Sequence, residues 1–249
     1  MALIFCCEFQ YTMKYSIWRS VIPLLIAFLA LSCQTDQYLK SDQVEQRLIF
    51  QFYEASYDAE NEFLSVVASF RENNPTGTTL ELTKESRILL NGQTMKGTYS
   101  DEEGYLYRME IKGPLPDNLT FLYHNNDSKE FQNRISISSF ELKDITTLTI
   151  HKKRGAVIPF AGKRFTDDET LYCHFYRNGD VIETIELPVY SGSTVSISPD
   201  ALSIITPGKY ECRFSRIGYS SDVTSMDRGG QYETEYISKK IKINIVEQY

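Results

Sequence analysis

The chain has 249 residues, of which 26 are basic and 33 are acidic, so its formal net charge is −7 at pH 7. This charge argues against nucleic acid or an anionic lipid surface as a partner, because both would repel the protein. The composition is that of a globular protein, with 42% hydrophobic and 24% charged residues.

The N-terminal segment has the features of a secretory signal. Lys14 and Arg19 precede an uncharged apolar run from Val21 to Leu31, and a positive region followed by a short apolar region is typical of such a leader. The run is too short to cross a bilayer, which needs about 20 apolar residues. We therefore expect residues 1–32 to be a cleaved signal peptide, and the late first positive charge, Lys14, suggests that Met13 is the true start.

The cleavage region, ALSC at residues 30–33, resembles the lipobox of bacterial lipoproteins. The resemblance implies that Cys33 is lipidated, with palmitate among its acyl chains, and that residues 33–41 are a tether. It also implies a membrane partner through this anchor and a place in the bacterial cell envelope. Because Gln34 rather than Asp follows the cysteine, the resemblance favours the outer membrane. The alternative is an ordinary cleaved signal in which the cysteine is incidental.

Most of the chain after the tether alternates apolar and polar residues with period two, which is typical of half-buried strands. The clearest runs are Leu48/Phe50/Phe52, Leu64/Val66/Ala68/Phe70, Tyr105/Tyr107/Met109/Ile111, Leu119/Phe121/Tyr123, Leu171/Cys173/Phe175 and Ile241/Ile243/Ile245. Turn residues separate these runs, and Asn178-Gly179 predicts a two-residue hairpin. A helix over Asp42 to Phe52 is an alternative that the β-branched and aromatic residues disfavour.

Many short strands at this spacing indicate β-sandwiches, which take about 100 residues each. The length after the tether therefore favours two domains, residues 42–143 and residues 144–249. The boundary is placed near Lys143, where the alternation pauses and then restarts. One large jelly-roll-like sandwich is the alternative.

The second half contains a motif, Gly208-Lys209-Tyr210-Glu211-Cys212, that resembles the tyrosine corner of immunoglobulin-like (Ig-like) domains. In that corner a tyrosine lies two residues before the cysteine of strand F. The whole chain resembles bacterial envelope lipoproteins built from tandem Ig-like domains. The expected fold is therefore all-β, with two tandem antiparallel Ig-like β-sandwich domains after a lipoprotein signal peptide.

Two cysteines, Cys173 and Cys212, remain once the leader and Cys33 are set aside. In an oxidising compartment such a pair favours a structural disulfide over a metal site or a reactive thiol. Each cysteine shares the apolar face of its strand, Cys173 with Leu171 and Phe175, and Cys212 with Tyr210 and Phe214. We therefore expect the bond to join two inward faces of the sandwich.

Residues for catalysis or for a cofactor are not arranged in a recognisable motif. The three histidines, His124, His151 and His174, have no second ligand at metal spacing. The acidic runs Asp101–Glu103 and Asp167–Glu169 lack the spaced oxygens of a calcium loop. We expect a protein that is not an enzyme and that holds no cofactor or metal. An enzyme with a site assembled from distant residues is an alternative.

The long stretch from Gly218 to Gln231 is the best candidate for binding a partner. If Cys212 lies on strand F, as the tyrosine-corner resemblance implies, this stretch is the F–G loop, a common recognition site of Ig-like domains. The candidate contact residues are Tyr219, Asp222, Met226 and Arg228. The alternative is a mobile hairpin tip without a binding role.

These observations predict a non-catalytic, lipid-anchored envelope protein that binds a protein partner or serves as a spacer or scaffold. Its oligomeric state stays open. The alternative function is carbohydrate binding by exposed tyrosines, for which the candidates are Tyr172, Tyr176, Tyr219 and Tyr232. The mature chain lacks the tryptophan platforms that are common in sugar-binding proteins, since Trp18 lies in the leader.

Overall fold

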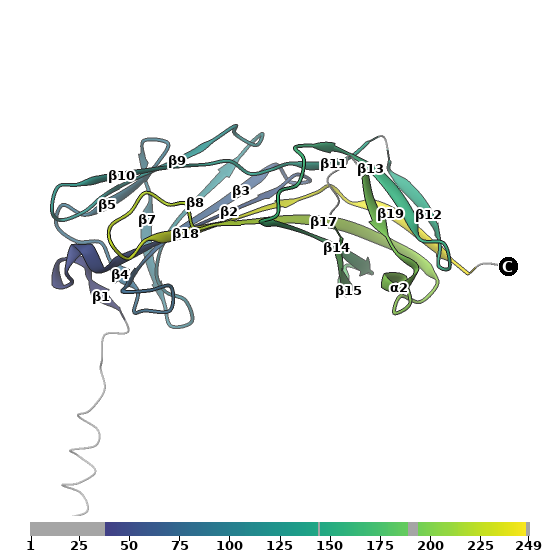
Figure 1. Cartoon of the computed structure of the whole chain (residues 1–249), viewed down its shortest axis with the longest axis horizontal. Helices are drawn as coiled ribbons and strands as arrows, with labels where there is room; N and C mark the ends of the chain where they lie inside the picture. Colours follow the sequence, from purple (N-terminus) through teal and green to yellow (C-terminus); the bar gives the residue numbers. More distant parts are fainter. Residues whose placement is uncertain (1–37, 144, 189–193, 248–249) are drawn as a thin grey trace, which may run out of the picture. The chain divides into compact units, whose positions relative to one another are not determined.

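The computed structural model describes residues 38–143, 145–188 and 194–247 (Figure 1). The expected leader and the lipidation site at Cys33 lie outside these residues, so both stay predictions. The described residues form an all-β protein, as predicted. The exceptions are two 3-10 turns, η1 (Ser41–Gln43) and η2 (Gln46–Leu48), and the short helix α2 (Pro199–Leu202).

Most strands in the described residues follow the predicted alternation. Those of the first half are β1 (Leu39–Lys40), β2 (Ile49–Asp58), β3 (Phe63–Glu72), β4 (Leu80–Glu81), β5 (Arg87–Leu90), β6 (Gln93–Thr94), β7 (Lys96–Ser100), β8 (Gly104–Lys112), β9 (Leu119–His124) and β10 (Glu130–Ile135). Those of the second half are β11 (Phe140–Leu142), β12 (Thr147–His151), β13 (Ala156–Gly162), β14 (Glu169–Arg177), β15 (Asp180–Leu187), β16 (Thr194–Ile197), β17 (Gly208–Ser220), β18 (Gly230–Ile237) and β19 (Ile241–Val246).

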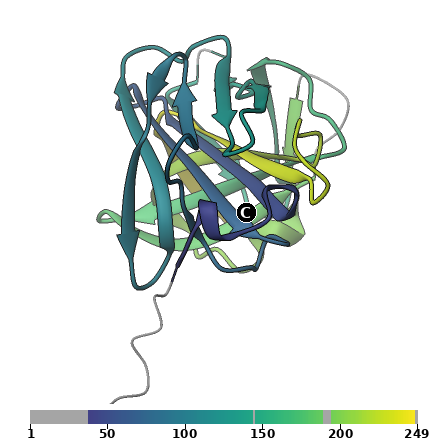
Figure 2. The same ribbon diagram turned by 90° about the vertical axis from the view of Figure 1, so that its left-hand side faces the viewer.

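The first sandwich packs the strands β18-β2-β3-β8-β7 against the sheet β10-β9-β5-β6 (Figure 1, Figure 2). Aromatic rings from both layers interlock between the sheets. The ring centroids of Tyr53 and Phe121 are 4.5 Å apart, and those of Phe70 and Tyr123 are 4.4 Å apart. All four side chains are fully buried, so these rings form the centre of the first core.

The start of β2 corrects one predicted face. Leu48 lies in η2, and the residues of β2 that face the core are Ile49, Gln51 and Tyr53 rather than Phe50 and Phe52. The sequence pattern does not indicate this face, because one of its buried residues, Gln51, is polar. Its side-chain oxygen accepts a hydrogen bond of 2.6 Å from the Tyr53 hydroxyl, which offsets part of the cost of burying an amide.

The second sandwich packs the strands β15-β14-β17-β19-β12 against the sheet β11-β13-β16. The predicted tyrosine corner is present, because the Tyr210 hydroxyl donates a hydrogen bond to the backbone oxygen of Thr206. The predicted hairpin is also confirmed. Asn178 and Gly179 join β14 to β15 with φ values of 57° and 93°, as a two-residue hairpin turn of type I′ requires.

The two sandwiches share one ten-stranded sheet. After pairing with β19, the long strand β17 continues and pairs with β18, and β18 pairs in parallel with β2. We call the second part of β17 (Ser215–Ser220) together with β18 the arm. The arm carries residues from beyond Lys143 into the first sandwich, and the chain from Tyr38 to Tyr249 forms one compact unit. The division into two domains at Lys143 stays a prediction.

The two cysteines lie differently from the expected arrangement. Cys173 on β14 and Cys212 on β17 belong to neighbouring strands of the same sheet, where Cys173 pairs with Phe214 and Cys212 with Phe175. A bond between facing sheets is therefore wrong. Both cysteines are free and fully buried in the structure. Burial, and then the neighbouring thiol of Cys212, raise the pKa of Cys173. Because both thiols are free in the structure, a disulfide between them stays a prediction.

Candidate functional site

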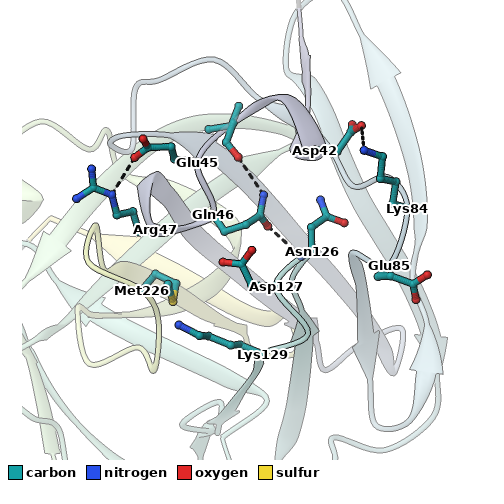
Figure 3. A pocket seen from close by; sticks show the side chains of 11 residues that line it. Asp42, Glu45, Gln46, Arg47, Lys84, Glu85, Asn126, Asp127, Lys129 and Met226 are labelled. Atoms are coloured by element: carbon teal, nitrogen blue, oxygen red, sulfur yellow. Dashed lines mark hydrogen bonds and ion pairs between the residues drawn. The ribbon is translucent and has the colours of Figure 1, made fainter.

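A pocket of about 630 Å³ lies where four separate segments of the chain meet (Figure 3). Its walls are residues 42–47 around the 3-10 turns, residues 84–85 before β5, residues 126–129 between β9 and β10, and Met226 from the loop between β17 and β18. Because these segments are far apart in the sequence, only the folded chain forms the pocket.

Gln46 holds two of these walls together. Its side chain is buried, and its nitrogen donates hydrogen bonds to the backbone oxygens of Ser41 at 2.6 Å and Val44 at 3.0 Å. Its oxygen accepts a hydrogen bond of 3.0 Å from the backbone nitrogen of Asn126. Figure 3 shows this amide between the two segments. A buried amide with three partners fixes the local backbone.

The turn between β9 and β10 is shaped by Asn125. Its side-chain oxygen accepts hydrogen bonds from the backbone nitrogens of Asp127 at 3.0 Å and Lys129 at 2.9 Å, which is the local bonding that favours asparagine in turns. The turn therefore presents Asp127 and Lys129 to the pocket in a defined conformation (Figure 3).

Two ion pairs lie along the pocket wall. Lys84 and Asp42 are 2.8 Å apart, and Arg47 and Glu45 are also 2.8 Å apart. The hydrogen bond from Lys84, followed by that from Thr83, lowers the pKa of Asp42 to about 2. Asp42 is thus ionised at neutral pH, and the pocket offers charges of both signs beside the apolar side chains of Val44 and Met226.

The loop that carries Met226 is attached to the first sandwich. The backbone nitrogen of Thr224 donates a hydrogen bond of 2.6 Å to the side-chain oxygen of Asn133, and the Asn133 amide donates one of 3.1 Å to the backbone oxygen of Thr224. Val223 and Met226 pack against the core. These contacts give the loop a defined position on β10.

The four residues predicted to contact a partner do not all meet. Met226 lines the pocket, whereas Asp222 and Arg228 are exposed elsewhere in the same loop. Tyr219 lies near the end of β17, opposite Glu233, and its side chain is 52% exposed. The contributions of Gln46 and of the other three walls were missed. The only signal for them in the sequence was the turn at residues 125–127.

The tyrosines considered for sugar binding do not form one platform. Tyr172 and Tyr176 lie on the outer face of β14, because the alternate residues of that strand are buried. Tyr219 faces outward on β17, whereas Tyr232 pairs with the buried Tyr53 and packs against the core. The set is therefore divided between the two faces of the sheet.

The histidine, cysteine and acidic residues of the described part of the chain are the types that a metal site would require, and the two predicted acidic runs each contribute an ion pair. Within it, no group of three histidine, cysteine or acidic residues is placed to hold a metal ion. Glu169, from one predicted acidic run, is paired with Arg216, and Glu103, from the other, is paired with Arg108. Among the same residues there is no helix of the length and apolarity that a membrane span requires.

Comparisons with known proteins give structural likeness only. No protein family model and no curated protein matches the chain. A tandem of titin Ig domains is 9% identical, with 80% of this chain and 96% of that chain covered and a TM-score of 0.23. A bacterial ice-binding adhesin that is retained on a host cell surface is 12% identical, with 81% and 66% covered and a TM-score of 0.21.

The N-terminal eight Ig domains of Down Syndrome Cell Adhesion Molecule are 9% identical, with a TM-score of 0.23. The match covers 80% of this chain but only 24% of that protein. Because all these TM-scores are below 0.5, no argument about function rests on the likenesses. The strand arrangement and the tyrosine corner define Ig-like β-sandwiches in this chain.

Proposed function

We propose that the protein is a non-catalytic, lipid-anchored component of the bacterial cell envelope that binds a protein partner at the pocket. The observation that carries this proposal is a recessed surface built from four segments and held in place by Gln46 and Asn133. A surface formed in advance loses little entropy when it binds, so such contacts contribute fully to affinity.

The chemistry of the pocket suits a segment of another protein. Apolar side chains, Val44 and Met226, are flanked by ion pairs and by the Asp127 and Lys129 side chains. Apolar and charged side chains lie side by side in protein interfaces as well. Methionine also adapts its shape to an apolar side chain of a partner.

Crosslinking in cells tests the binding surface. We expect a photoreactive phenylalanine at Lys129 or at Met226 to capture one defined partner. The control is the same group at Val181 on β15, a side chain that is 54% exposed and far from the pocket in the sheet order. A capture pattern that is the same at Val181 as at Lys129 would contradict the proposal.

The location is proposed from the leader and the lipobox resemblance. Lipid chains on Cys33 would hold the protein in the outer membrane, and durable attachment needs more than one chain. Mass spectrometry of the N-terminal peptide tests lipidation. Digestion of intact and lysed cells with a protease that cannot enter them then separates a surface position from a periplasmic one.

A disulfide between Cys173 and Cys212 remains part of this proposal, because an oxidising compartment favours it. Protein recovered from the cell envelope is unfolded and treated with an alkylating reagent. The bond predicts that neither cysteine is alkylated until a reductant is added. Alkylation of both cysteines without reductant would contradict it.

A further inference from the structure

Three tyrosines from three elements gather at the start of the described chain. The ring centroid of Tyr38 is 5.0 Å from that of Tyr99 on β7 and 5.1 Å from that of Tyr105 on β8. Tyr99 is 37% exposed, and the other two side chains are half-buried. We call Tyr38, Tyr99 and Tyr105 the tyrosine cluster.

The backbone is adapted to this cluster at Gly97. A Cβ atom at residue 97 would lie 2.6 Å from a ring carbon of Tyr105 and 3.0 Å from a ring carbon of Tyr107. The ring of Tyr105 therefore lies directly against β7, where only glycine leaves room for it. The centroids of Tyr105 and Tyr107 are 5.5 Å apart, and the buried Tyr107 connects the cluster to the core.

The chain between the cluster and the expected anchor is short. Only residues 34–37 separate Cys33 from Tyr38. Even when fully extended, the five steps from the Cα atom of Cys33 to that of Tyr38 span no more than about 18 Å. The head-group layer of a bilayer is about 6 Å thick on each side of the hydrocarbon, so a lipid on Cys33 would keep the cluster close to this layer.

We propose that the tyrosine cluster contacts the head-group layer of the membrane to which the protein is anchored. This inference rests on the lipidation of Cys33 in the proposed function. Tyrosine combines an apolar ring with a polar hydroxyl, and it is enriched at membrane interfaces for this reason. The contact adds a second attachment beside the lipid and limits how the domains orient on the membrane.

The charges around the cluster select the kind of lipid. Asp101, Glu102 and Glu103 follow β7, and the Tyr99 hydroxyl donates a hydrogen bond to Asp101. Glu103 is paired with Arg108, and the other two carboxylates repel an anionic surface. The surface that fits is therefore a zwitterionic one such as phosphatidylcholine, and the contact should depend little on salt.

The chain allows a direct test, because its only tryptophan, Trp18, lies in the leader. The mature chain with Tyr99→Trp is coupled through Cys33 to a maleimide phospholipid in phosphatidylcholine vesicles. Cys173 and Cys212 are both 0% exposed, so Cys33 is the reactive thiol. Vesicles whose acyl chains are brominated near the head group should then reduce the fluorescence of the introduced tryptophan about twofold, as expected for a side chain at the interface.

The matched control is Tyr219→Trp in the same coupled protein. Tyr219 lies on β17, five strands from β7 in the sheet order, which corresponds to about 24 Å. Its fluorescence should be unchanged by the brominated lipid. Tyr38→Trp is a second reporter in the cluster, for use if Tyr99→Trp disturbs folding as judged by circular dichroism.

Failure of the membrane contact and failure of the proposed lipid anchor give different results. Unquenched fluorescence from both cluster reporters in the coupled protein would overturn the inference, whatever cells attach to Cys33. Equal quenching in the Tyr219→Trp control would overturn it as well, since contact would then not be specific to the cluster. Failure of the proposed anchoring would instead appear as an unmodified Cys33 in protein from cells, with quenching still present in the coupled protein.

Discussion

Arg216 is a charged side chain inside the protein, and only 1% of it is exposed. Its five N–H groups all have acceptors. Two bond to the carboxylate of Glu169, at 3.1 Å and 2.6 Å, and the others to the backbone oxygens of Ser139, Lys163 and Arg164, at 3.1, 2.7 and 2.9 Å. This arginine therefore joins β17, near the base of the arm, to three other segments.

Replacing this arginine, in Arg216→Met, should lower the free energy of unfolding by about 3 to 5 kcal/mol. The change leaves the Glu169 carboxylate and three carbonyls without their donor in a buried place. Urea unfolding at pH 7 measures the loss. The control is Arg108→Met, whose pair with Glu103 has side chains that are 42% and 55% exposed, so the expected loss is under about 1 kcal/mol. Equal losses in both variants would contradict the prediction.

The pair of Arg216 and Glu169 also makes the stability of the protein depend on pH in a known direction. Burial acts to raise the pKa of Glu169, but the hydrogen bonds from Arg216 and from the backbone of Thr166, together with the charge of Arg216, outweigh it, and the pKa lies below its usual value. The stabilisation is therefore present above the pKa of an unfolded glutamate and is lost as the pH falls through the lower folded pKa. The difference between Arg216→Met and the unmodified protein should shrink in acid.

The pKa of Glu233 is raised, whereas that of Glu169 is lowered. Glu233 lies directly opposite Glu54 where β18 pairs with β2, and burial, followed by the charges of Glu54 and Glu235, raises its pKa. A raised pKa means that the charged form costs stability at neutral pH and that the cost is relieved as the pH falls. Glu233→Gln should therefore stabilise the protein at pH 7, by about 0.5 kcal/mol for a cross-strand pair of like charges.

Urea unfolding at two pH values checks this prediction. The gain should disappear below about pH 4, where glutamates bind their protons. Glu110→Gln is the control, because Glu110 on β8 lies opposite Ser65 rather than a carboxylate. A gain from Glu233→Gln that is the same at both pH values would show that charge is not its cause.

The loop between β17 and β18 depends on one side chain of a neighbouring strand. Asn133→Ala removes both hydrogen bonds to the backbone of Thr224. We expect a loss of about 1 to 2 kcal/mol in stability. Faster hydrogen exchange should be confined to residues 221–229, as measured by mass spectrometry. Gln132→Ala, at an exposed position of the same strand, should leave this exchange unchanged, and an equal effect there would refute the role of Asn133.

The strands themselves were predictable because alternation is a local property. Leu64, Val66, Ala68 and Phe70 are all buried, as the pattern indicated. The pairing of β18 with β2 was not predictable, since no local signal records which distant strand will be the neighbour. The inner face of β2 was misassigned because a buried polar residue, Gln51, interrupts the pattern.

The pocket was predictable only in part. Met226 was chosen from a long loop, a feature that is visible in the sequence. The partner segments at residues 42–47, 84–85 and 126–129 are brought to it by tertiary packing. Nothing in the sequence distinguishes a buried glutamine such as Gln46 from one on the surface, because its burial results from tertiary packing.

The arm makes the two sandwiches depend on each other. In β18, Tyr236 is buried and stacks on Tyr57 of β2 with ring centroids 5.8 Å apart. A fragment of residues 38–143 lacks this strand, and the edge of β2 that β18 covers is then free to pair with another chain. The first sandwich should therefore be less stable alone than in the whole protein, and more prone to associate.

Size-exclusion chromatography and urea unfolding of residues 38–143 check this expectation against residues 38–249. We expect the fragment to elute as oligomers and to unfold at a lower urea concentration. A monomeric fragment with the stability of the whole chain would contradict this expectation and would support two separable domains at Lys143.

The parallel pairing of β18 with β2 also has a consequence for the order in which the protein is made. Ser56 and Glu235, which share a hydrogen bond across this pair, are 179 positions apart. A ribosome adds about 5 to 20 residues per second, so β2 emerges roughly 10 to 35 seconds before its partner. During that time the growing chain has an unpaired strand edge, and the N-terminal sandwich reaches its final form only after β18 has been made.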